Sequence, residues 1–357
     1  MLARAEVDIN SQWMGYVAAG ASDAEGKGLL FGTRALVIGE DGTTAGAIYN
    51  VHTKSKRQTA ESGVIGKFAT GEVKHRLQVS LNVLKHEEGT NNTPCTYCYT
   101  TNMYDPVTPV FPAAPGWTGY DTARVHQKND FQSLAVADAM SFAQDTVLLT
   151  VGMRHQTVKQ PLAGYDASRV SPTIAGVVRP WGDAVSFFGN YTEGLQPGQT
   201  VGSTYTNAGQ TFKPMQTKQA EVGVKVQTAA LTHTFSTYQI EKPSLIEQNN
   251  YLLEGGKQRL RGLEWSVYGQ ITPTLSLLGG VTHIKSRQVN TGKDTYGVPE
   301  WRAQVGLDWA TPIDNLSVGG RVLYTGKQWA DSGNRLSVPS WNRLDLTAKY
   351  AMKVGAT

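Results

Sequence analysis

Hydrophobic and polar residues alternate strictly over residues 301–309, which read WRAQVGLDW. The apolar phase consists of Trp301, Ala303, Val305, Leu307 and Trp309, and the other phase holds only Arg, Gln, Gly and Asp. This period of two predicts a β-strand with one apolar and one polar face. A soluble sandwich would bury the apolar face in a core, whereas a membrane barrel would turn it towards lipid and keep the polar face in its lumen. The alternation alone leaves both folds open.

The same alternation recurs elsewhere along the chain. Largely apolar residues occupy every second position in 73–83, 220–226 and 344–350, and most positions between them are charged or polar. Charged side chains in the lumen of a wide barrel can stay hydrated or pair across strands, which removes the cost of burying them. These segments predict further strands of the same kind.

The lengths of the connections favour the barrel. Short connections are expected at 10–11, 70–72, 144–145, 180–183, 227–229, 272–274 and 311–315, and each is followed by a longer one, at about 21–56, 87–120, 158–168, 194–216, 241–257, 285–298 and 326–340. Outer-membrane barrels have short turns at one end and long loops at the other, whereas a Greek-key sandwich has no reason to alternate. The rhythm predicts an all-β, antiparallel, up-and-down transmembrane β-barrel sheet of about fifteen strands.

The spacing of Trp301 and Trp309 fits a membrane. Eight residue steps at about 3.3 Å, tilted by about 40°, give a height of about 20 Å, close to the apolar band of about 25 Å in such barrels. We therefore expect the two rings at opposite membrane interfaces, where tryptophan is enriched. The alternative is a pair of core tryptophans in a sandwich.

Composition narrows the classes further. The 357 residues include 33 Lys and Arg against 29 Asp and Glu, a net charge of +4 with both signs scattered, so no nucleic-acid partner is expected. No run approaches the roughly 20 consecutive apolar residues of a spanning helix. The N-terminal MLARAEVDINSQ lacks the pattern of a signal peptide and already looks like a strand, so the sequence is expected to begin within a fold. Cys95 and Cys98 are expected to form a local disulfide or to remain thiols, because a structural zinc site needs about four ligands.

No catalytic constellation emerges. The GASDAEGKGLL segment around Lys27 lacks the spacing of a phosphate-binding loop, and the seven histidines are not paired at metal-ligand spacings. Glu87 and Glu88 adjoin a predicted loop and are expected to be surface charges, because two adjacent side chains on a strand would point to opposite faces. We therefore predict no enzyme, no metal site and no cofactor bound by protein side chains.

Several stretches resemble the C-terminal half of TonB-dependent siderophore receptors. They follow the family's order: VSFFGNYTEGLQPGQTV at 185–201, KQAEVGVKVQTAALTHTFSTYQIEKPS at 218–244, then GGKQRLRGLEWSVYG, GVPEWRAQVGLDW, VGGRVLYTGKQWAD and PSWNRLDLTAKY. Each motif is weak alone, but their ordered succession is specific and covers about 140–351.

The resemblance implies an outer-membrane transporter of Gram-negative bacteria. Such receptors are barrels of 22 strands filled by an N-terminal plug, and they import ferric siderophores with energy passed on by the TonB complex. On this basis residues 1–357 are expected to be a partial receptor β-barrel domain, about fifteen of the 22 strands, without plug domain or last strands. The implied partners are a ferric siderophore, outer-membrane lipid and, through the missing N-terminal region, the TonB complex. Iron would arrive as the ferric siderophore itself.

Ligand recognition would then fall to the long loops. An iron chelate brings its own metal ligands, so the protein need supply only aromatic faces and hydrogen bonds. The candidate ligand-binding residues are Tyr97, Tyr99, Tyr104, Trp117 and Tyr120 in the segment 95–120, and Tyr296 and Trp329 further along, with Tyr205 and Tyr251 of the same kind. The competing interpretation is that these rings pack loop against loop.

Two other functions remain open from the residues alone. A self-contained passive porin-like barrel would need a closing strand pair and opposed charges at a constriction. A secreted soluble β-sandwich lectin or adhesin would dissolve without detergent, whereas the barrel would not.

Overall fold

The computed structural model describes residues 2–28, 34–107, 123–196, 198–202 and 204–352, and at 34, 35, 48–50 and 92–98 it describes the backbone alone. No helix within these ranges is long and apolar enough to cross a membrane. The chain forms two compact units: Met1–Val64, Val79–Leu134 and Gln156–Ser168 make up the first, and Ile65–Gln78, Ala135–His155 and Arg169–Thr357 make up the second.

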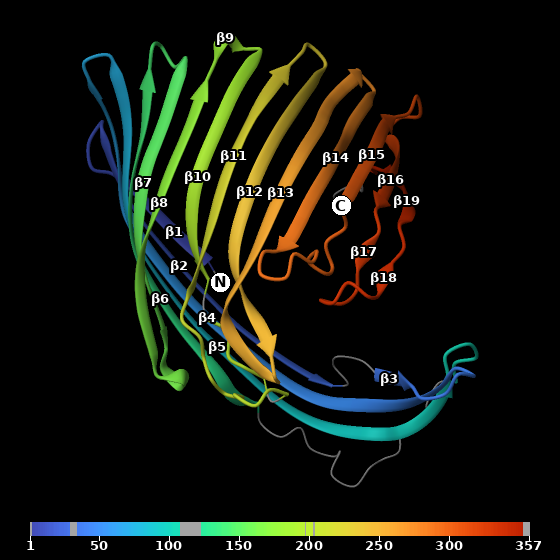
Figure 1. Ribbon diagram of the computed structural model, residues 1–357. Helices are drawn as coiled ribbons and strands as arrows, with labels where there is room; N and C mark the ends of the chain where they lie inside the picture. The colour runs from blue at the N-terminus through green and yellow to red at the C-terminus, as the bar shows by residue number, and fades with distance from the viewer. Residues whose placement is uncertain (1, 29–33, 108–122, 197, 203, 353–357) are drawn as a thin grey trace, which may run out of the picture. The chain divides into compact units, whose positions relative to one another are not determined.

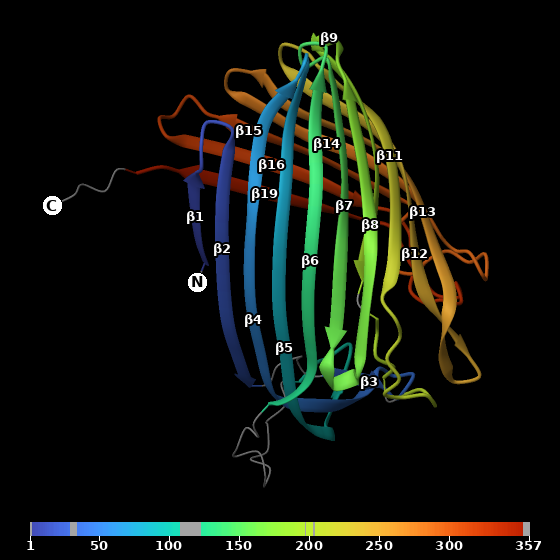
Figure 2. The same ribbon diagram turned by 90° about the vertical axis from the view of Figure 1, so that its left-hand side faces the viewer.

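Antiparallel strands dominate both units (Figures 1 and 2). They are β1 (Leu2–Asp8), β2 (Trp13–Gly28), β3 (Arg34–Val37), β4 (Thr43–Thr70), β5 (Val73–Asn102), β6 (Arg124–Phe142), β7 (Val147–Gln160), β8 (Tyr165–Val178), β9 (Pro180–Asp183), β10 (Val185–Gln196), β11 (Met215–Gln227), β12 (Leu231–Gln248), β13 (Tyr251–Thr272), β14 (Leu275–Gln288), β15 (Trp301–Ala310), β16 (Leu316–Thr325), β17 (Gln328–Trp329), β18 (Ser337–Val338) and β19 (Trp341–Tyr350), with one 3₁₀ helix, η1 (Pro161–Ala163).

The main strands pair in chain order, as an up-and-down sheet requires. The order is β1-β2-β4-β5-β6-β7-β8-β10-β11-β12-β13-β14-β15-β16-β19, with β3 pairing beside β4 and β17 with β18 as a separate hairpin. The expected count of about fifteen strands is confirmed. In the second unit, Figure 1 shows β10 to β14 as long neighbouring strands.

All of the short connections occur where they were expected, but two of the long ones are wrong. Between β7 and β8 only four residues intervene, 161–164, and η1 occupies three of them. Between β12 and β13 only Asn249 and Asn250 intervene, because both strands continue far past the predicted boundaries. The segments 21–56 and 87–120 are also partly strand, since β2, β4 and β5 extend into them.

The predicted faces of β15 are confirmed. Trp301 and Trp309 keep 47% and 43% of their surface exposed, and Val305 midway between them keeps 49%, so this face does not form the core of a sandwich. The opposite face carries polar side chains, and Asp308 on it lies beside Gly319 of β16. We call the face of Trp301, Val305 and Trp309 the outer face and its opposite the lumen face.

The strand register extends the outer face across the second unit. Rows of directly paired residues run from β10 to β15: Val185, Val226, His233, Val267, Gly279 and Val305 in one row, Phe187, Val224, Phe235, Trp265, Val281 and Ala303 in the next, and Gly189, Val222, Thr237, Leu263, His283 and Trp301 in the third. These rows are predominantly apolar, as lipid contact requires. On the lumen face, Asp345 of β19 pairs with Arg321 at 3.1 Å and Arg343 at 3.0 Å, which offsets their charges in that sheet.

Candidate functional site

Four connections at one end of the second unit are joined by hydrogen bonds to one another or to β13. They are the connection 198–214, of which residue 203 is not described, the hairpin tip at 249–252, and the loops 289–300 and 326–340. We call this group the loop platform. Its side chains are those that a molecule approaching this end of the sheet would meet.

The connection 198–214 is ordered by its own small core. Val201 and Phe212 are buried together with Leu252 of β13, and Tyr205, Met215 and Leu245 pack around them. Burial of the apolar side chains of this Gly-, Thr- and Gln-rich segment contributes about 1.5–3 kcal/mol each and favours its packing onto the β12–β13 hairpin.

Asn207 fastens this connection to the hairpin tip. Its Nδ2 donates to the Leu252 carbonyl at 2.7 Å, and its Oδ1 accepts from the Leu252 N–H at 3.0 Å. The amide side chain thus satisfies one backbone donor and one acceptor, as a neighbouring strand would. The Thr206 N–H also donates to the Asn250 carbonyl at 2.8 Å.

The hairpin tip itself depends on two asparagines. Asn249 and Asn250 have φ values of 50° and 62°, both in the left-handed region. Consecutive positive φ values define a type I′ turn, which matches the right-handed twist of the strands and which asparagine tolerates well. This local chemistry allows β12 and β13 to meet in a tight turn at the end of the sheet.

The loops 289–300 and 326–340 are joined through Asp294 and Asn334. The Asp294 N–H donates to Asn334 Oδ1 at 2.8 Å, and Asn334 Nδ2 donates to the Asp294 carbonyl at 2.9 Å. The Gly297 N–H donates to the Trp329 carbonyl at 2.8 Å. The two loops therefore form one unit.

The turn 331–336 is held by the carboxylate of Asp331. It accepts the N–H groups of Leu336 at 2.7 Å, Arg335 at 2.8 Å and Gly333 at 3.0 Å. These donors, that of Leu336 foremost, lower the pKa of Asp331 because they stabilise its charged form.

The loop 289–300 is joined to β13, a few residues beyond the hairpin tip. The Lys257 N–H donates to Asn290 Oδ1 at 2.9 Å, the Val289 N–H donates to the Lys257 carbonyl at 2.7 Å, and Asn290 Nδ2 donates to the Gly255 carbonyl at 3.1 Å. All four connections are therefore linked, directly or through β13, and their aromatic side chains have a common support.

Three aromatic candidates lie on this platform. The negative charge of Glu247, whose carboxylate accepts from the Tyr205 hydroxyl at 3.3 Å, raises the pKa of Tyr205, and Tyr296 contributes in the same direction. Tyr296 is 54% exposed. The Trp329 indole N–H donates to Asp294 Oδ2 at 3.3 Å, and Lys327 Nζ lies 4.8 Å from the Trp329 ring centroid.

The candidates of the first unit have a different environment. The Tyr99 ring lies directly over Gly46 and the Tyr104 ring over Gly42, so closely that a Cβ at either glycine would collide with it. Tyr104 is nevertheless 75% exposed. The Asp41 turn beneath them is ordered by the Thr43 N–H, which lowers the pKa of Asp41.

The remaining candidates fall outside the described residues or side chains. Trp117 and Tyr120 lie in the undescribed segment 108–122, and only the backbone is described at Tyr97, Cys95 and Cys98. Tyr251, at the hairpin tip, is exposed. Within the described part of the chain, no three His, Cys, Asp or Glu side chains are grouped so that they could hold a metal ion.

The sequence reasoning did not identify the residues that support the site. Asn207, Asp331 and Asn334 order the platform, and their only sequence signal is the density of Asn, Asp and Gly in the loops. It also passed over two basic runs at period two, Lys257-Arg259-Arg261 and Lys285-Arg287, which the register brings to one face.

Comparison with known proteins gives a consistent assignment. The family model "TonB dependent receptor-like, beta-barrel" matches residues 11–357. The ferrichrome receptor FcuA of Yersinia enterocolitica is 27% identical over 99% of this chain and 49% of its own length. The ferrioxamine receptor of the same species is 23% identical over 78% of this chain and 41% of its own length.

A solved structure agrees. The ferric preacinetobactin receptor BauA from Acinetobacter baumannii superposes with a TM-score of 0.83 at 30% identity, over 99% of this chain and 55% of that chain. The chain therefore spans about half the length of the relatives it matches. The antiparallel order, the lipid-facing rows and the matched span together place the chain in the outer membrane as a member of the TonB-dependent receptor-like β-barrel family.

Proposed function

We propose that this chain is the barrel portion of an outer-membrane receptor that binds ferric siderophores with its loop platform and imports them with TonB-coupled energy. The relatives include receptors for ferrichrome, ferrioxamine and preacinetobactin, so the substrate class is shared although the individual chelates differ. Iron enters as part of the chelate and needs no protein side chain as ligand.

The observation that carries the proposal is the grouping of Tyr205, Tyr296 and Trp329 on interlocked loops. Phenol and indole rings offer large apolar contact and a polar edge at a small cost in side-chain entropy. Lys327 adds a positive charge beside Trp329, which suits a chelate with anionic donor oxygens. Because hydrogen bonds already join these loops, the loops lose less conformational entropy when a ligand binds.

Tryptophan fluorescence tests the proposal directly. The chain in detergent is titrated with a panel of ferric siderophores, as the wild type and as Trp329→Phe and Trp181→Phe. Trp181 lies in the short connection at the opposite end of the strands and is exposed, so it is the matched control. We expect saturable quenching by one class of chelate, lost in Trp329→Phe and retained in Trp181→Phe.

Tyr296→Ala provides a second, independent measurement. Removal of this exposed ring should weaken binding of the chelate that quenches the fluorescence. Trp329 is intact in this variant and still reports that binding. Affinity in this chain alone is expected to be weaker than submicromolar, because the relatives are about twice as long and bring further residues. Quenching that is equal for all chelates, or that depends on Trp181, would refute the assignment of the platform.

A further inference from the structure

Three polar side chains of the second unit form a relay at the end of the strands where the short connections lie. Thr70 ends β4, His75 lies near the start of β5, and Asp138 lies near the end of β6. His75 Nε2 is 2.7 Å from Thr70 Oγ1, and His75 Nδ1 is 2.7 Å from Asp138 Oδ2. A hydroxyl, an imidazole and a carboxylate in this order are the groups of a nucleophile, its general base and the acid that positions the base.

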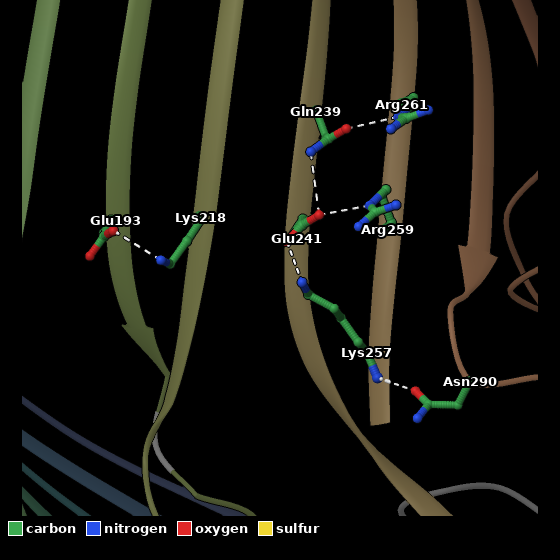
Figure 3. Close-up of polar contacts among 8 residues, drawn as sticks. All are labelled: Glu193, Lys218, Gln239, Glu241, Lys257, Arg259, Arg261 and Asn290. Atoms are coloured by element: carbon green, nitrogen blue, oxygen red, sulfur yellow. Dashed lines mark hydrogen bonds and ion pairs between the residues drawn. The ribbon is translucent and has the colours of Figure 1, made fainter. Parts of the chain in front are cut away.

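The relay differs from the polar contacts at the loop end of the same sheet. There, Glu241 pairs with Arg259 at 2.7 Å and with Lys257 at 2.6 Å (Figure 3). Those contacts join opposite charges across neighbouring strands. The relay also contains a hydroxyl, which becomes a nucleophile when a base removes its proton, so charge pairing alone does not account for it.

The carboxylate fixes the tautomer of His75. An ionised carboxylate only accepts hydrogen bonds, so Asp138 Oδ2 places the ring proton on His75 Nδ1. Nε2 then keeps a lone pair and accepts from the Thr70 hydroxyl. Phe68 stacks on the imidazole with ring centroids 4.9 Å apart and an interplanar angle of 9°, which holds the ring in this orientation.

Burial separates the hydroxyl from its two partners. The side chains of His75 and Asp138 keep only 14% and 22% of their surface exposed, whereas Thr70 is exposed. Asp138 Oδ1 is buried and has no hydrogen-bond partner among the described residues. Its uncompensated negative charge stabilises the imidazolium that forms when His75 takes a proton.

The relay lies on the outer face. The period of two along β6 places Asp138 on the same face as Val136, which is exposed like the apolar residues of the outer face of β15. His75 bonds to Asp138 across neighbouring strands and therefore shares this face. In outer-membrane barrels the short connections lie on the periplasmic side, so the relay meets the membrane surface there. Ionisable side chains on a membrane-embedded face are costly and usually mark a functional site.

The turn beside Thr70 leaves room for a substrate. Gly71 has a φ of 61°, and a Cβ at this position would meet no atom outside its chain neighbours within 4 Å. The backbone N–H of the residue that follows a nucleophile is a common donor to the oxyanion of the tetrahedral intermediate. Gly71 occupies that position in the chain.

We propose that the relay hydrolyses the acyl esters of glycerophospholipids in the leaflet that meets the short connections. A glycerophospholipid carries these esters between its polar headgroup and its hydrocarbon chains, at the level of the membrane surface. Val136 and Val151 are exposed beside the relay on β6 and β7 and provide an apolar surface for the acyl chain. Sequence spacing could not indicate this site, because Asp138 is 63 residues beyond His75.

The reaction needs only these groups, the ester and one water molecule. Thr70 Oγ1 attacks the ester carbonyl carbon while His75 Nε2 takes the hydroxyl proton. The bond to the glycerol oxygen breaks, and His75 gives the proton to that oxygen, which leaves a lysophospholipid and an acyl-threonine. Water, deprotonated by His75, then attacks the acyl carbonyl, and Thr70 recovers its proton as the fatty acid leaves.

Hydrolysis by the purified chain tests the activity. The probes are p-nitrophenyl octanoate in detergent micelles and phosphatidylcholine vesicles that contain the chain, with release of nitrophenol and of fatty acid as the measurements. Thr70→Val should lower kcat on the order of a hundredfold or more, since general acid–base catalysis contributes about 10²–10⁴-fold. Thr70→Ser, which keeps a hydroxyl at the same position, should retain hydrolysis. Circular dichroism checks the sheet in each protein.

Asp138→Asn tests the positioning role of the carboxylate. An amide no longer fixes the proton on His75 Nδ1, so kcat should fall on the order of a hundredfold while KM is unchanged. Two matched controls should hydrolyse like the wild type. Thr272→Val changes a threonine at another short connection, and His283→Gln changes a histidine that pairs with Glu300 at 3.1 Å.

A fluorophosphonate probe gives a second measurement that does not depend on turnover. Trypsin releases residues 68–74 as one peptide, FATGEVK, in which Thr70 carries the only hydroxyl. Mass spectrometry should find the probe on this peptide in the wild type. Labelling should be lost in Asp138→Asn, in which Thr70 itself is unchanged.

Three results would overturn the proposal: wild-type hydrolysis no faster than that of Thr70→Val, hydrolysis that is lost in Thr70→Ser as well, or equal losses in the two controls. The outcome is independent of the proposed siderophore binding. Quenching of Trp329 by a ferric chelate should be the same in Thr70→Val as in the wild type, because the two sites lie at opposite ends of the strands.

Discussion

The same strands behave differently in their membrane-embedded part and at their loop end. Between the levels of Trp309 and Trp301, apolar and polar residues alternate, and the outer face is exposed and apolar. Beyond Trp301, β12, β13 and β14 continue as strands, with one register shift in the β12–β13 pairing between Ser244 and Ile246, but their outer face carries Arg, Lys and Glu. Both parts are β-sheet, and the main difference lies in the surroundings of the side chains.

This difference shows what the alternation indicates. A period of two in hydrophobicity indicates a sheet whose two faces meet different environments, such as lipid and water. Where both faces meet water or headgroups, the period is lost although the strand persists, and hydrogen bonds between connections order the structure instead. The predictions below test each part separately, beginning with the largest expected effect.

Val305→Arg should cause the largest loss of stability. Val305 lies four residues from each tryptophan, at the middle of the apolar band, and an arginine at the bilayer midplane costs about 2–4 kcal/mol. The measurement is the free energy of unfolding in urea, with the chain in lipid vesicles. Gln304→Arg on the lumen face is the control, for which a change within about 0.5 kcal/mol is expected.

Equal destabilisation by Val305→Arg and Gln304→Arg would contradict the assignment of the outer face to lipid and of the lumen face to water. Repeating the measurement in detergent tests whether the effect depends on the bilayer, since micelles adapt to a charged side chain more easily than a bilayer does. The difference between Val305→Arg and Gln304→Arg should therefore be smaller there.

Asn207→Ala should have a smaller effect that is confined to the loop end. It removes both bonds to the Leu252 backbone, and leaving such groups unsatisfied costs about 1–3 kcal/mol. Hydrogen exchange should show faster opening of the hairpin tip and unchanged protection in β15. Gln199→Ala, whose side chain has no bond among the described residues, is the control, and equal exchange in both variants would contradict the role of Asn207.

The sequence predicted the embedded part well, because the bilayer imposes a single rule on every second residue. Three patterns were sufficient to predict the number and order of the strands and the face of β15 that is exposed: the alternation of apolar and polar residues, the alternation of short and long connections, and the spacing of Trp301 and Trp309. The two connections at 158–168 and 241–257 were wrong because polar strands above the membrane resemble loops in composition. In the second of these segments, Pro243, Gly255 and Gly256 lie within β12 and β13 although such residues are typical of loops.

The candidate site was predicted only in part. Aromatic residues in long connections could be picked out individually, and Tyr296 and Trp329 lie on loops that bond to each other. Their support could not be predicted, because Asn207, Asn334 and Asp331 act on backbone groups far away in sequence. The grouping of the two basic runs was missed because it depends on register: that Arg259 and Arg287 lie opposite each other follows only from the β13–β14 pairing.

Asn249→Val should shorten the β12–β13 hairpin. The left-handed backbone conformation costs a β-branched residue roughly 1–2 kcal/mol, whereas asparagine and glycine adopt it easily. Loss of amide protection near Gln248 and Tyr251 is expected by hydrogen exchange. Asn249→Gly should preserve the turn, so an equal effect of the two substitutions would show that the side chain, and not the backbone, determines this connection.

Acidification should have the smallest effect, limited to the turn 331–336. Because the folded pKa of Asp331 lies below its ordinary value, its contribution is fully present above the unfolded pKa and is lost as the pH falls through the lower, folded pKa. The protection factors of the Gly333, Arg335 and Leu336 amides should therefore be constant near neutrality and decline only below about pH 4. Asp331→Asn should reduce protection already at neutral pH and abolish the decline. A decline centred near neutrality, or one that persists in Asp331→Asn, would show that another group controls this turn.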